Sequence, residues 1–388
     1  MKIDKKILII VIAALIIKLS LFFFASIHAP QGKLLPDSYG YLRLADTFAT
    51  KGIFGIQNED GTMSYERFRT PGYPLFLGIF KDILKIPLDG IIFIQIVITL
   101  LVAYIIYKTA YKIAPQIALL SSAIILFDPP ITISSLAVMA ESLLLLFISL
   151  FIFSFILYLN SRKVIFLLLS ALSLVLATYV KPVPYYLGFV LFFFILYSNW
   201  GKIFWKYFKH ALIFLLIVYS LLGIWQVRNY ARFHNVAFSS VENENYGKML
   251  FRRYARNNDP NAKGMSPVSY YINASIRCAL SFMTRPGSLK YFKSHLLTVI
   301  GKVLAYPWMV FWLVGFIWGT VKFRRDLYVQ LLLVIIAYFT LASVGMLAWD
   351  AAERYRVPMV PCIAIISAYG WANLLSYCHK SRLVWKNI

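Results

Sequence analysis

The sequence predicts an all-α polytopic membrane protein. Of its 388 residues, 60% are hydrophobic and only 14% are charged, whereas soluble domains average about 25% charged residues. The apolar residues form long uncharged runs, each long enough, or nearly so, to cross about 30 Å of hydrocarbon as a helix. These observations leave no room for a large soluble domain, so we expect residues 1–388 to form a single transmembrane domain.

About ten transmembrane helices are expected. The apolar runs cover residues 7–27, 88–107, 113–127, 131–159, 164–180, 184–199, 210–227, 298–320, 327–348 and 356–376. The first run follows a basic head, as in a signal peptide, but its apolar part is too long and no cleavage site follows it. We therefore interpret it as an uncleaved span.

The charges predict the orientation of these spans. Every second connection is rich in Lys and Arg, as cytoplasmic loops are, and of the 16 acidic residues only Asp4 and Asp326 fall in these connections. Both termini are therefore expected in the cytoplasm, with two large outer loops at residues 28–87 and 228–297. The net charge of +23 then reflects inner loops and membrane lipids, and no nucleic acid partner is expected.

The first outer loop contains an amphipathic helix, predicted from Ser38 to Thr50 by its apolar periodicity. Asp37 lies four residues before Tyr41 and projects from the same face. Asp46 points to the opposite face, where an ion pair with Arg43 is expected. Asp37 could cap the helix N-terminus or serve a function, and the pattern alone leaves both interpretations open.

Arginines precede a proline-bracketed turn in the segment "RFRTPGYPLF". Arg67 and Arg69 come immediately before Pro71, where the chain is expected to return to the membrane. The guanidinium groups could anchor the loop at the interface. They could also bind a lipid-linked phosphate, which Arg contacts with a forked pair of donors.

Two further charged residues fall at the outer ends of spans. Glu141 heads the apolar segment "ESLLLLF", and an acid at this depth is a functional candidate. Lys181, in "YVKPVPYY", could extend along the membrane surface with its ammonium group in water. Asp128, before two prolines, is expected to mark a turn.

The second outer loop departs from the positive-inside pattern. Eleven Lys or Arg residues lie between 228 and 297, interleaved with Tyr and Phe, which indicates an anionic partner such as a lipid or sugar phosphate. Glu242 and Glu244 are weak evidence for a metal, so a divalent metal is possible but not indicated, and no cofactor is expected. Near the last span, "WDAAERYRVPMVP" places Glu353, Arg354 and Arg356 at the membrane edge, either as a structural ion pair or as part of an anion site.

The ordered motifs resemble the GT-C membrane glycosyltransferases, which include the protein O-mannosyltransferases and the enzymes that add aminoarabinose to lipid A. The motifs are an Asp followed by "Y-x-x-L-A", then "PGYP", "ESLLLLF", "RNY" at the start of the second loop, and "RYRVPMVP". P-loop, G-x-S-x-G, H-E-x-x-H and dinucleotide-binding motifs are missing from the sequence.

The resemblance implies a GT-C-type bundle of about ten transmembrane helices, with amphipathic helices in the two large outer loops. It also implies inverting transfer of a sugar from a polyprenyl-phosphate donor to an acceptor lipid, glycan or protein. The reaction would occur at the extracytoplasmic face of the plasma membrane, with Asp37 and Glu141 as catalytic acids. We predict that the donor phosphate is bound by Arg67, Arg69, Lys181, Arg228, Arg354 and Arg356. We predict that the substrate pocket includes Tyr41, Tyr73, Asn229, Tyr230, Glu353 and Tyr355.

Two other functions remain open at this point. One is a lipid-linked glycan transporter or flippase, and the other is an enzyme like an O-antigen ligase or polymerase. A transporter is expected to carry charged or broken spans near the bilayer midplane. Here Lys18 is the main charged residue within a span, and the distinctive residues gather at one face.

Overall fold

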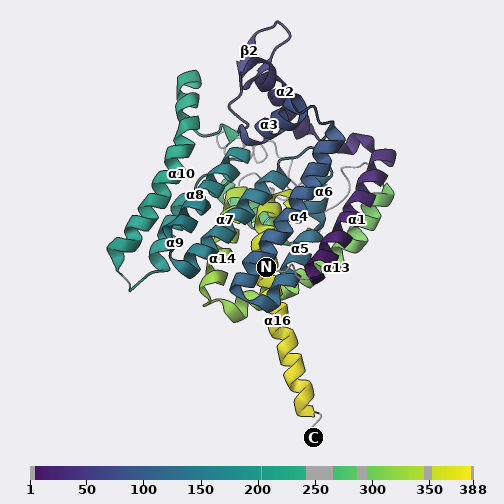
Figure 1. Cartoon of the computed structure of the whole chain (residues 1–388), viewed down its shortest axis with the longest axis vertical. Coiled ribbons are helices and arrows are strands. Elements are labelled where there is room, and N and C mark those ends of the chain that lie inside the picture. The colour runs from purple at the N-terminus through teal and green to yellow at the C-terminus, as the bar shows by residue number, and fades with distance from the viewer. Residues whose placement is uncertain (1–4, 202, 242–264, 286–294, 345–351, 386–388) are drawn as a thin grey trace.

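The computed structural model describes residues 5–201, 203–241, 265–285, 295–344 and 352–385. Its described part is a bundle of helices with a smaller group of elements at one end, and the C-terminal helix projects from the opposite end (Figure 1). The prediction of an all-α membrane bundle is confirmed, with one small two-stranded sheet as the exception.

Each predicted apolar run folds as helix. The bundle helices in the first half of the chain are α1 (Lys5–His28), α4 (Leu88–Ile113), α5 (Ala118–Leu126), α6 (Pro129–Ser135), α7 (Glu141–Ser161) and α8 (Val164–Val180). The later ones are α9 (Leu187–Tyr197), α10 (Phe204–Phe233), α13 (His295–Phe323), α14 (Leu327–Val344) and α16 (Val360–Trp385).

The number of full-length spans is smaller than the ten expected. Among the described residues, 7 helices are long and apolar enough to cross a membrane, or 8 if one bent pair is counted as a span. The predicted spans at 164–180 and 184–199 are the shorter helices α8 and α9, of 17 and 11 residues. The predicted span at 131–159 is interrupted, because α6 ends at Ser135 and α7 begins at Glu141.

The bent pair has a local cause at Asp128. The helical segment up to Leu126 and α6 meet at 52°, and two prolines follow the bend, which removes amide donors there. Asp128 caps the new helix, since its Oδ1 accepts from the Ile131 amide at 3.1 Å. The predicted turn at Asp128 is therefore confirmed.

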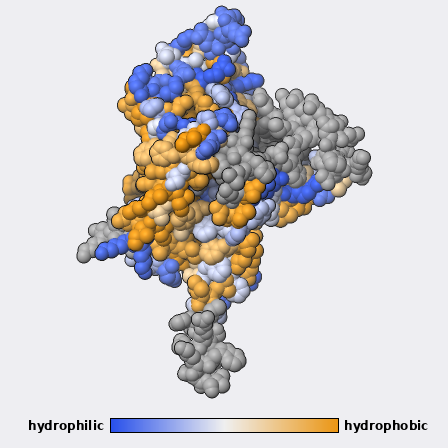
Figure 2. All heavy atoms as spheres, turned by 90° about the vertical axis from the view of Figure 1, so that its right-hand side faces the viewer, coloured by the Kyte–Doolittle hydropathy of each residue, from blue (hydrophilic) through white to orange (hydrophobic). Residues whose placement is uncertain are grey.

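Burial separates central from peripheral helices. In the apolar window of α7, 67% of residues are buried, against 22% in α1. Large side chains such as Ile9 and Phe23 of α1 are more than half exposed, as lipid-facing residues are. Figure 2 shows apolar side chains covering the middle of the molecule, with hydrophilic side chains gathered at the end that carries the small sheet.

The first outer loop folds over one end of the bundle. Its elements are a 3₁₀ turn η1 (Pro30–Lys33), α2 (Pro36–Lys51), β1 (Gly55–Gln57), β2 (Met63–Tyr65), α3 (Gly72–Leu77) and the π-helical η2 (Gly78–Ile83). The strands pair antiparallel, with Ile56 opposite Ser64. The predicted amphipathic helix is thus confirmed as α2. Its Asp46 forms an ion pair with Lys81 of η2 instead of the expected pair with Arg43.

The described part of the second outer loop also contains an amphipathic helix, α12 (Pro267–Thr284), as predicted for the outer loops. Its buried face includes Tyr270, Ala274 and Cys278. It packs against α14 and against the short helix α15 (Ala352–Arg356), which precedes the 3₁₀ turn η8 (Val357–Met359) and α16. This packing places α15 at the end of the bundle that α2 covers.

Candidate functional site

The start of α2 positions Asp37. Leu35 is the N-cap, and its amide donates to Ser38 Oγ at 2.9 Å. Ser38 Oγ in turn donates to the Val138 carbonyl at 2.7 Å, which fixes α2 to the segment before α7. Asp37 lies in the first turn and is not the cap, so that interpretation is wrong. Its carboxylate is 46% exposed and benefits from the positive end of the helix dipole.

The break between α6 and α7 is held in place by the first loop and α4. The Val138 amide donates to the Lys33 carbonyl at 2.9 Å, and Gln95 Nε2 donates to the Ala137 carbonyl at 2.6 Å. These bonds satisfy backbone groups that the break would otherwise leave buried and unpaired. They also fix the first residue of α7, Glu141, whose side chain is only 1% exposed.

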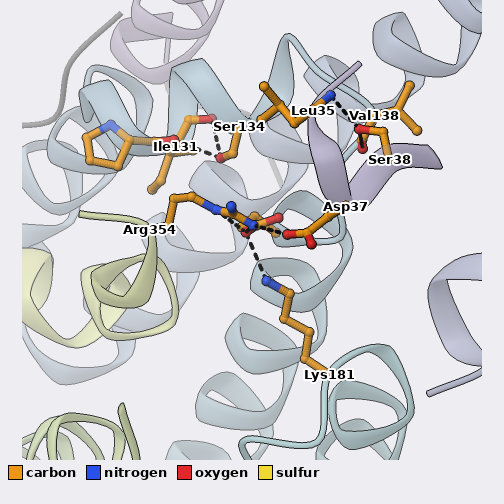
Figure 3. A network of polar contacts seen from close by, with 10 residues as sticks. Leu35, Asp37, Ser38, Ile131, Ser134, Val138, Lys181 and Arg354 are labelled. Carbon is orange, nitrogen blue, oxygen red and sulfur yellow. Dashed lines mark hydrogen bonds and ion pairs between the residues drawn. The ribbon is translucent and has the colours of Figure 1, made fainter. Parts of the chain in front are cut away.

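Arg354 of α15 joins the two acids. Its Nη2 donates to Asp37 Oδ2 at 3.1 Å and to Glu141 Oε1 at 2.9 Å, and its Nε donates to the same Glu141 oxygen at 3.1 Å. Lys181, at the end of α8, donates to that oxygen at 2.9 Å. Figure 3 shows the Arg354 side chain reaching toward Asp37 and toward the carboxylate that Lys181 also contacts.

A third cation, Arg69, lies against α2. Its guanidinium is 5.6 Å from the centre of the Tyr41 ring, a cation–π geometry. Its Nη1 lies 3.8 Å from Glu66 Oε2, and its side chain is 23% exposed. Arg69 is therefore held beside the base of α2, with the carboxylate of Glu66 as its ion-pair partner.

These side chains line one cavity of about 230 Å³. Its described lining residues are Asp37, Tyr41, Phe68, Arg69, Thr70, Glu141, Val180, Lys181, Pro182, Val183, Val241, Arg354 and Tyr355. Three cations thus face two carboxylates, with apolar walls around them. Three cationic side chains that face one partly enclosed space can bind an anionic ligand, because the low dielectric strengthens the attraction.

Tyr41 forms the floor between the charged groups. Burial raises the pKa of its phenol well above the usual value, and the carboxylates of Glu141 and Asp37 raise it further. The phenol therefore stays neutral across the physiological range. A neutral hydroxyl here can donate a hydrogen bond but does not serve as a base.

Three of the predicted residues lie elsewhere, at the end of α10. Arg228 donates to the Phe54 carbonyl at 2.9 Å and to the Glu66 carbonyl at 2.7 Å. The Asn229 amide donates to the carbonyls of Ala237 and Phe238. Their donors are used by backbone oxygens, and neither residue is among the described lining. The structure thus places Arg228 and Asn229 apart from the described lining of the cavity.

Tyr230 likewise lies apart from the described lining of the cavity. It is 56% exposed, stacks edge-on with His234, and is not part of the described lining. Tyr73 is fully buried, and its hydroxyl donates to Gln95 Oε1 at 2.6 Å. Its ring lies 4.9 Å from that of Tyr41, so it supports the cavity floor from behind.

Two of the predicted phosphate-binding arginines also lie away from the cavity. Arg67 is exposed and is not among the described lining residues. Arg356 is 1% exposed; it donates to the carbonyls of Phe282 and Arg285 and lies 3.7 Å from Asp128. Arg356 thus connects α12 with the bend before α6. The side chain of Glu353 and residues 242–264, with Glu242 and Glu244, lie outside what the structure describes.

The sequence missed several apolar lining residues, among them Phe68, Val183 and Val241. Phe68 is adjacent to Arg69, and Val183 is two residues after Lys181. Their closeness in the chain to these predicted site residues could have indicated them. Val241 carries no local signal, because only the folded chain brings it to the cavity.

The described side chains of the cavity offer few ligands to a divalent metal. Among the described residues, no group of three or more His, Cys, Asp and Glu side chains could hold a metal ion. The two carboxylates at the cavity are bridged by Arg354. Hard divalent cations need several oxygen ligands free of competing cations.

Comparison with known proteins identifies a related sequence family over part of the chain. Residues 69–225 match the model of the dolichyl-phosphate-mannose-protein mannosyltransferase family. This segment includes Arg69, Glu141 and Lys181. No curated protein matches the chain at the level of sequence.

Solved structures match the whole bundle. The Archaeoglobus fulgidus oligosaccharyltransferase AglB, in complex with an inhibitory peptide and a dolichol-phosphate, matches with a TM-score of 0.55 and 13% identity, over 96% of this chain and 52% of that one. An A. fulgidus oligosaccharyltransferase in complex with Zn and sulfate matches with a TM-score of 0.60 and 14% identity, over 95% of this chain and 49% of that one. ArnT from Cupriavidus metallidurans, bound to undecaprenyl phosphate, matches with a TM-score of 0.57 and 16% identity, over 93% of this chain and 59% of that one. The chain thus spans about half the length of these structures.

Proposed function

Because this chain is a multi-pass membrane protein with the GT-C fold, we propose that it is an inverting glycosyltransferase. It would move a sugar from a polyprenyl-phosphate donor to an acceptor lipid, glycan or protein. The observation that carries this proposal is that the side chains of Asp37, Arg69, Lys181 and Arg354 line the same cavity. Donor phosphate and acceptor would meet there.

The cations act on the phosphate. When the bond from the anomeric carbon to the phosphate oxygen breaks, its electron pair leaves with the polyprenyl phosphate. Arg69, Lys181 and Arg354 stabilise that developing charge through charge-assisted hydrogen bonds, which are strongest where water is excluded. The three cationic side chains that line the cavity support this role.

Asp37 acts on the acceptor. As an acceptor hydroxyl or amine forms its bond to the anomeric carbon, its proton passes to the Asp37 carboxylate. One base opposite the leaving phosphate gives one displacement and hence inversion at that carbon. The exposure of the Asp37 side chain, 46%, leaves it accessible to an acceptor.

Glu141 acts through the cations it binds. Its Oε1 accepts from both Lys181 and Arg354, so the buried carboxylate fixes both side chains at the cavity wall. The sequence interpretation of Glu141 as a second catalytic acid becomes, in this proposal, a positioning role.

The ligands of two similar structures support a polyprenyl-phosphate donor. One was obtained with a dolichol-phosphate and another with undecaprenyl phosphate, and both are polyprenyl phosphates. We further propose that the protein lies in the plasma membrane, with α2 and the cavity on the extracytoplasmic side and both termini in the cytoplasm. Basic inner connections support this orientation.

The proposal is tested by following the sugar. The purified protein, in detergent or liposomes, is incubated with a series of polyprenyl monophosphate sugars labelled in the sugar and with a membrane extract as acceptor source. We expect the label to leave the lipid for at least one donor and to appear in a new covalent product. Label that stays on the lipid for every donor would contradict the proposal, and label that crosses the liposome membrane still attached to lipid would indicate a transporter.

A further inference from the structure

A glycine inside α2 is not explained by backbone geometry. Gly40 lies within the helix Pro36–Lys51, and among the described glycines only Gly52, Gly61 and Gly201 have positive φ. Glycine in a helix interior costs about 1 kcal/mol relative to alanine. Gly40 thus lowers the stability of α2, and its missing side chain leaves room beside the helix.

The space beside Gly40 is filled by the guanidinium of Arg69. A Cβ atom on Gly40 would lie 2.5 Å from Arg69 Cζ, 2.6 Å from its Nη2 and 2.9 Å from its Nε. All three nearest atoms belong to this one group, and each distance is shorter than van der Waals contact. The guanidinium therefore occupies the place that a side chain at position 40 would take.

This place has a fixed relation to the carboxylate of Asp37. Residues three apart on a helix are neighbours on one face, about 5–6 Å apart at Cβ, so positions 37 and 40 lie side by side. The ring of Tyr41 borders the guanidinium on another side at 5.6 Å. Helix α2 thus carries Asp37 and, in the gap at Gly40, positions a cation beside it.

We propose that Gly40 is a positioning residue that seats the Arg69 guanidinium in the cavity, where it contacts the donor phosphate. This inference depends on the proposed function, because it assigns Arg69 to the phosphate of that reaction. A side chain at position 40 would displace the guanidinium and leave the other cavity residues in place.

The variant Gly40→Ala tests this directly. The atoms that must move are the end of a flexible side chain, and alanine favours helix, so we expect the thermal unfolding temperature to stay the same or rise. Loss of one charge-assisted contact of about 1.5–3 kcal/mol predicts polyprenyl phosphate binding weakened by about 10–100-fold. The donor KM should rise with it, while the acceptor KM stays unchanged.

The chain offers matched controls. Gly223 also lies in a helix, α10, and a Cβ there meets nothing within 4 Å, so Gly223→Ala should bind polyprenyl phosphate as the parent does. Gly72 is the opposite case, because its Cβ would lie 2.7 Å from the Tyr179 carbonyl. Gly72→Ala should therefore lower the unfolding temperature, which Gly40→Ala should not.

A double-mutant cycle separates positioning from a general structural effect. If Gly40 acts through Arg69, Gly40→Ala should weaken binding no further once Arg69→Ala is present. If Gly40→Ala alone proves unstable because of the clash, Arg69→Ala should restore the unfolding temperature. Parental affinity in Gly40→Ala, an equal further loss in the double variant, or instability that Arg69→Ala does not relieve would each overturn the inference.

The inference and the proposed function can fail separately. Polyprenyl phosphate binding is measured without turnover, for example by tryptophan fluorescence or by native mass spectrometry. A parent that transfers sugar while Gly40→Ala binds donor normally would contradict only the role of Gly40. A parent that binds polyprenyl phosphate through Arg69 and Gly40 but transfers no sugar from any donor would contradict only the enzyme assignment.

Discussion

Two regions at the end of the bundle that carries α2 use arginine in different ways. At the cavity, Arg354 donates to the side-chain carboxylates of Asp37 and Glu141. At the end of α10, Arg228 donates to the backbone carbonyls of Phe54 and Glu66 and lies over the Trp225 ring at 4.6 Å. The first arrangement places charged groups around a cavity. The second binds α10 to the residues on either side of the strands β1 and β2. The partner of an arginine, more than its presence in an outer loop, thus distinguishes a binding role from a structural one.

The largest effect is expected from Asp37→Asn. Loss of a general base lowers turnover by roughly 10²–10⁴-fold, while the exposed position leaves the fold intact. Asp46→Asn is the matched control, because Asp46 lies on the same helix, its side chain is 51% exposed, and its carboxylate forms an ion pair with Lys81. Sugar transfer by Asp37→Asn at the rate of Asp46→Asn would remove the catalytic assignment.

Arg354→Gln should come next. It removes a cation at the phosphate and leaves Glu141 with Lys181 as its remaining described cationic partner. Charged hydrogen bonds contribute about 1.5–3 kcal/mol, so we expect polyprenyl phosphate affinity to fall by about 10–100-fold. Isothermal titration calorimetry measures this. Unchanged affinity would show that Arg354 serves only to pair the two acids.

Arg228→Gln should show the opposite pattern. The Phe54 and Glu66 carbonyls lose the bonds from Arg228, while Phe54 still accepts from the Glu66 amide at 3.2 Å. The loss predicts destabilisation by about 1–3 kcal/mol and a lower unfolding temperature. Binding of polyprenyl phosphate to the folded fraction should equal that of the parent. A selective loss of donor affinity with normal stability would instead place Arg228 at the phosphate and erase the contrast between the two regions.

The smallest effect is expected from Tyr41→Phe. The ring that faces Arg69 remains, and its cation–π contact is retained. Because burial and the neighbouring carboxylates raise the pKa of the phenol, it is neutral in the parent, so the pH profile of transfer should not change below about pH 10. We expect donor affinity to change by less than about threefold, or roughly 0.6 kcal/mol. A shifted pH optimum would show that the phenol exchanges a proton during transfer.

Local sequence pattern predicted the elements and many charged residues of the cavity. Apolar periodicity predicted α2, and uncharged runs predicted the bundle helices. Asp37, Glu141 and Arg354 were singled out because acids and arginines at the membrane edge are costly without a purpose. These signals are local, so a single chain suffices to detect them.

The pairing of these residues was beyond local pattern. Asp37 and Arg354 are 317 positions apart, and Arg228 is 174 positions from the Phe54 carbonyl that it binds. Both arginines have aromatic neighbours in the chain, so only tertiary contacts separate their roles. The three-residue strands were missed because so short a segment shows too little alternation to stand out. Gly40 was missed because a glycine in a helix reveals its purpose only through what fills its space.

The most direct test of the account is an experimental structure of the protein with polyprenyl phosphate bound. We expect the phosphate in the cavity, within hydrogen-bond distance of Arg69, Lys181 or Arg354, with the Asp37 carboxylate facing it across the space for the sugar. A phosphate bound at Arg228 or Arg356, with the cavity separated from the lipid, would contradict it.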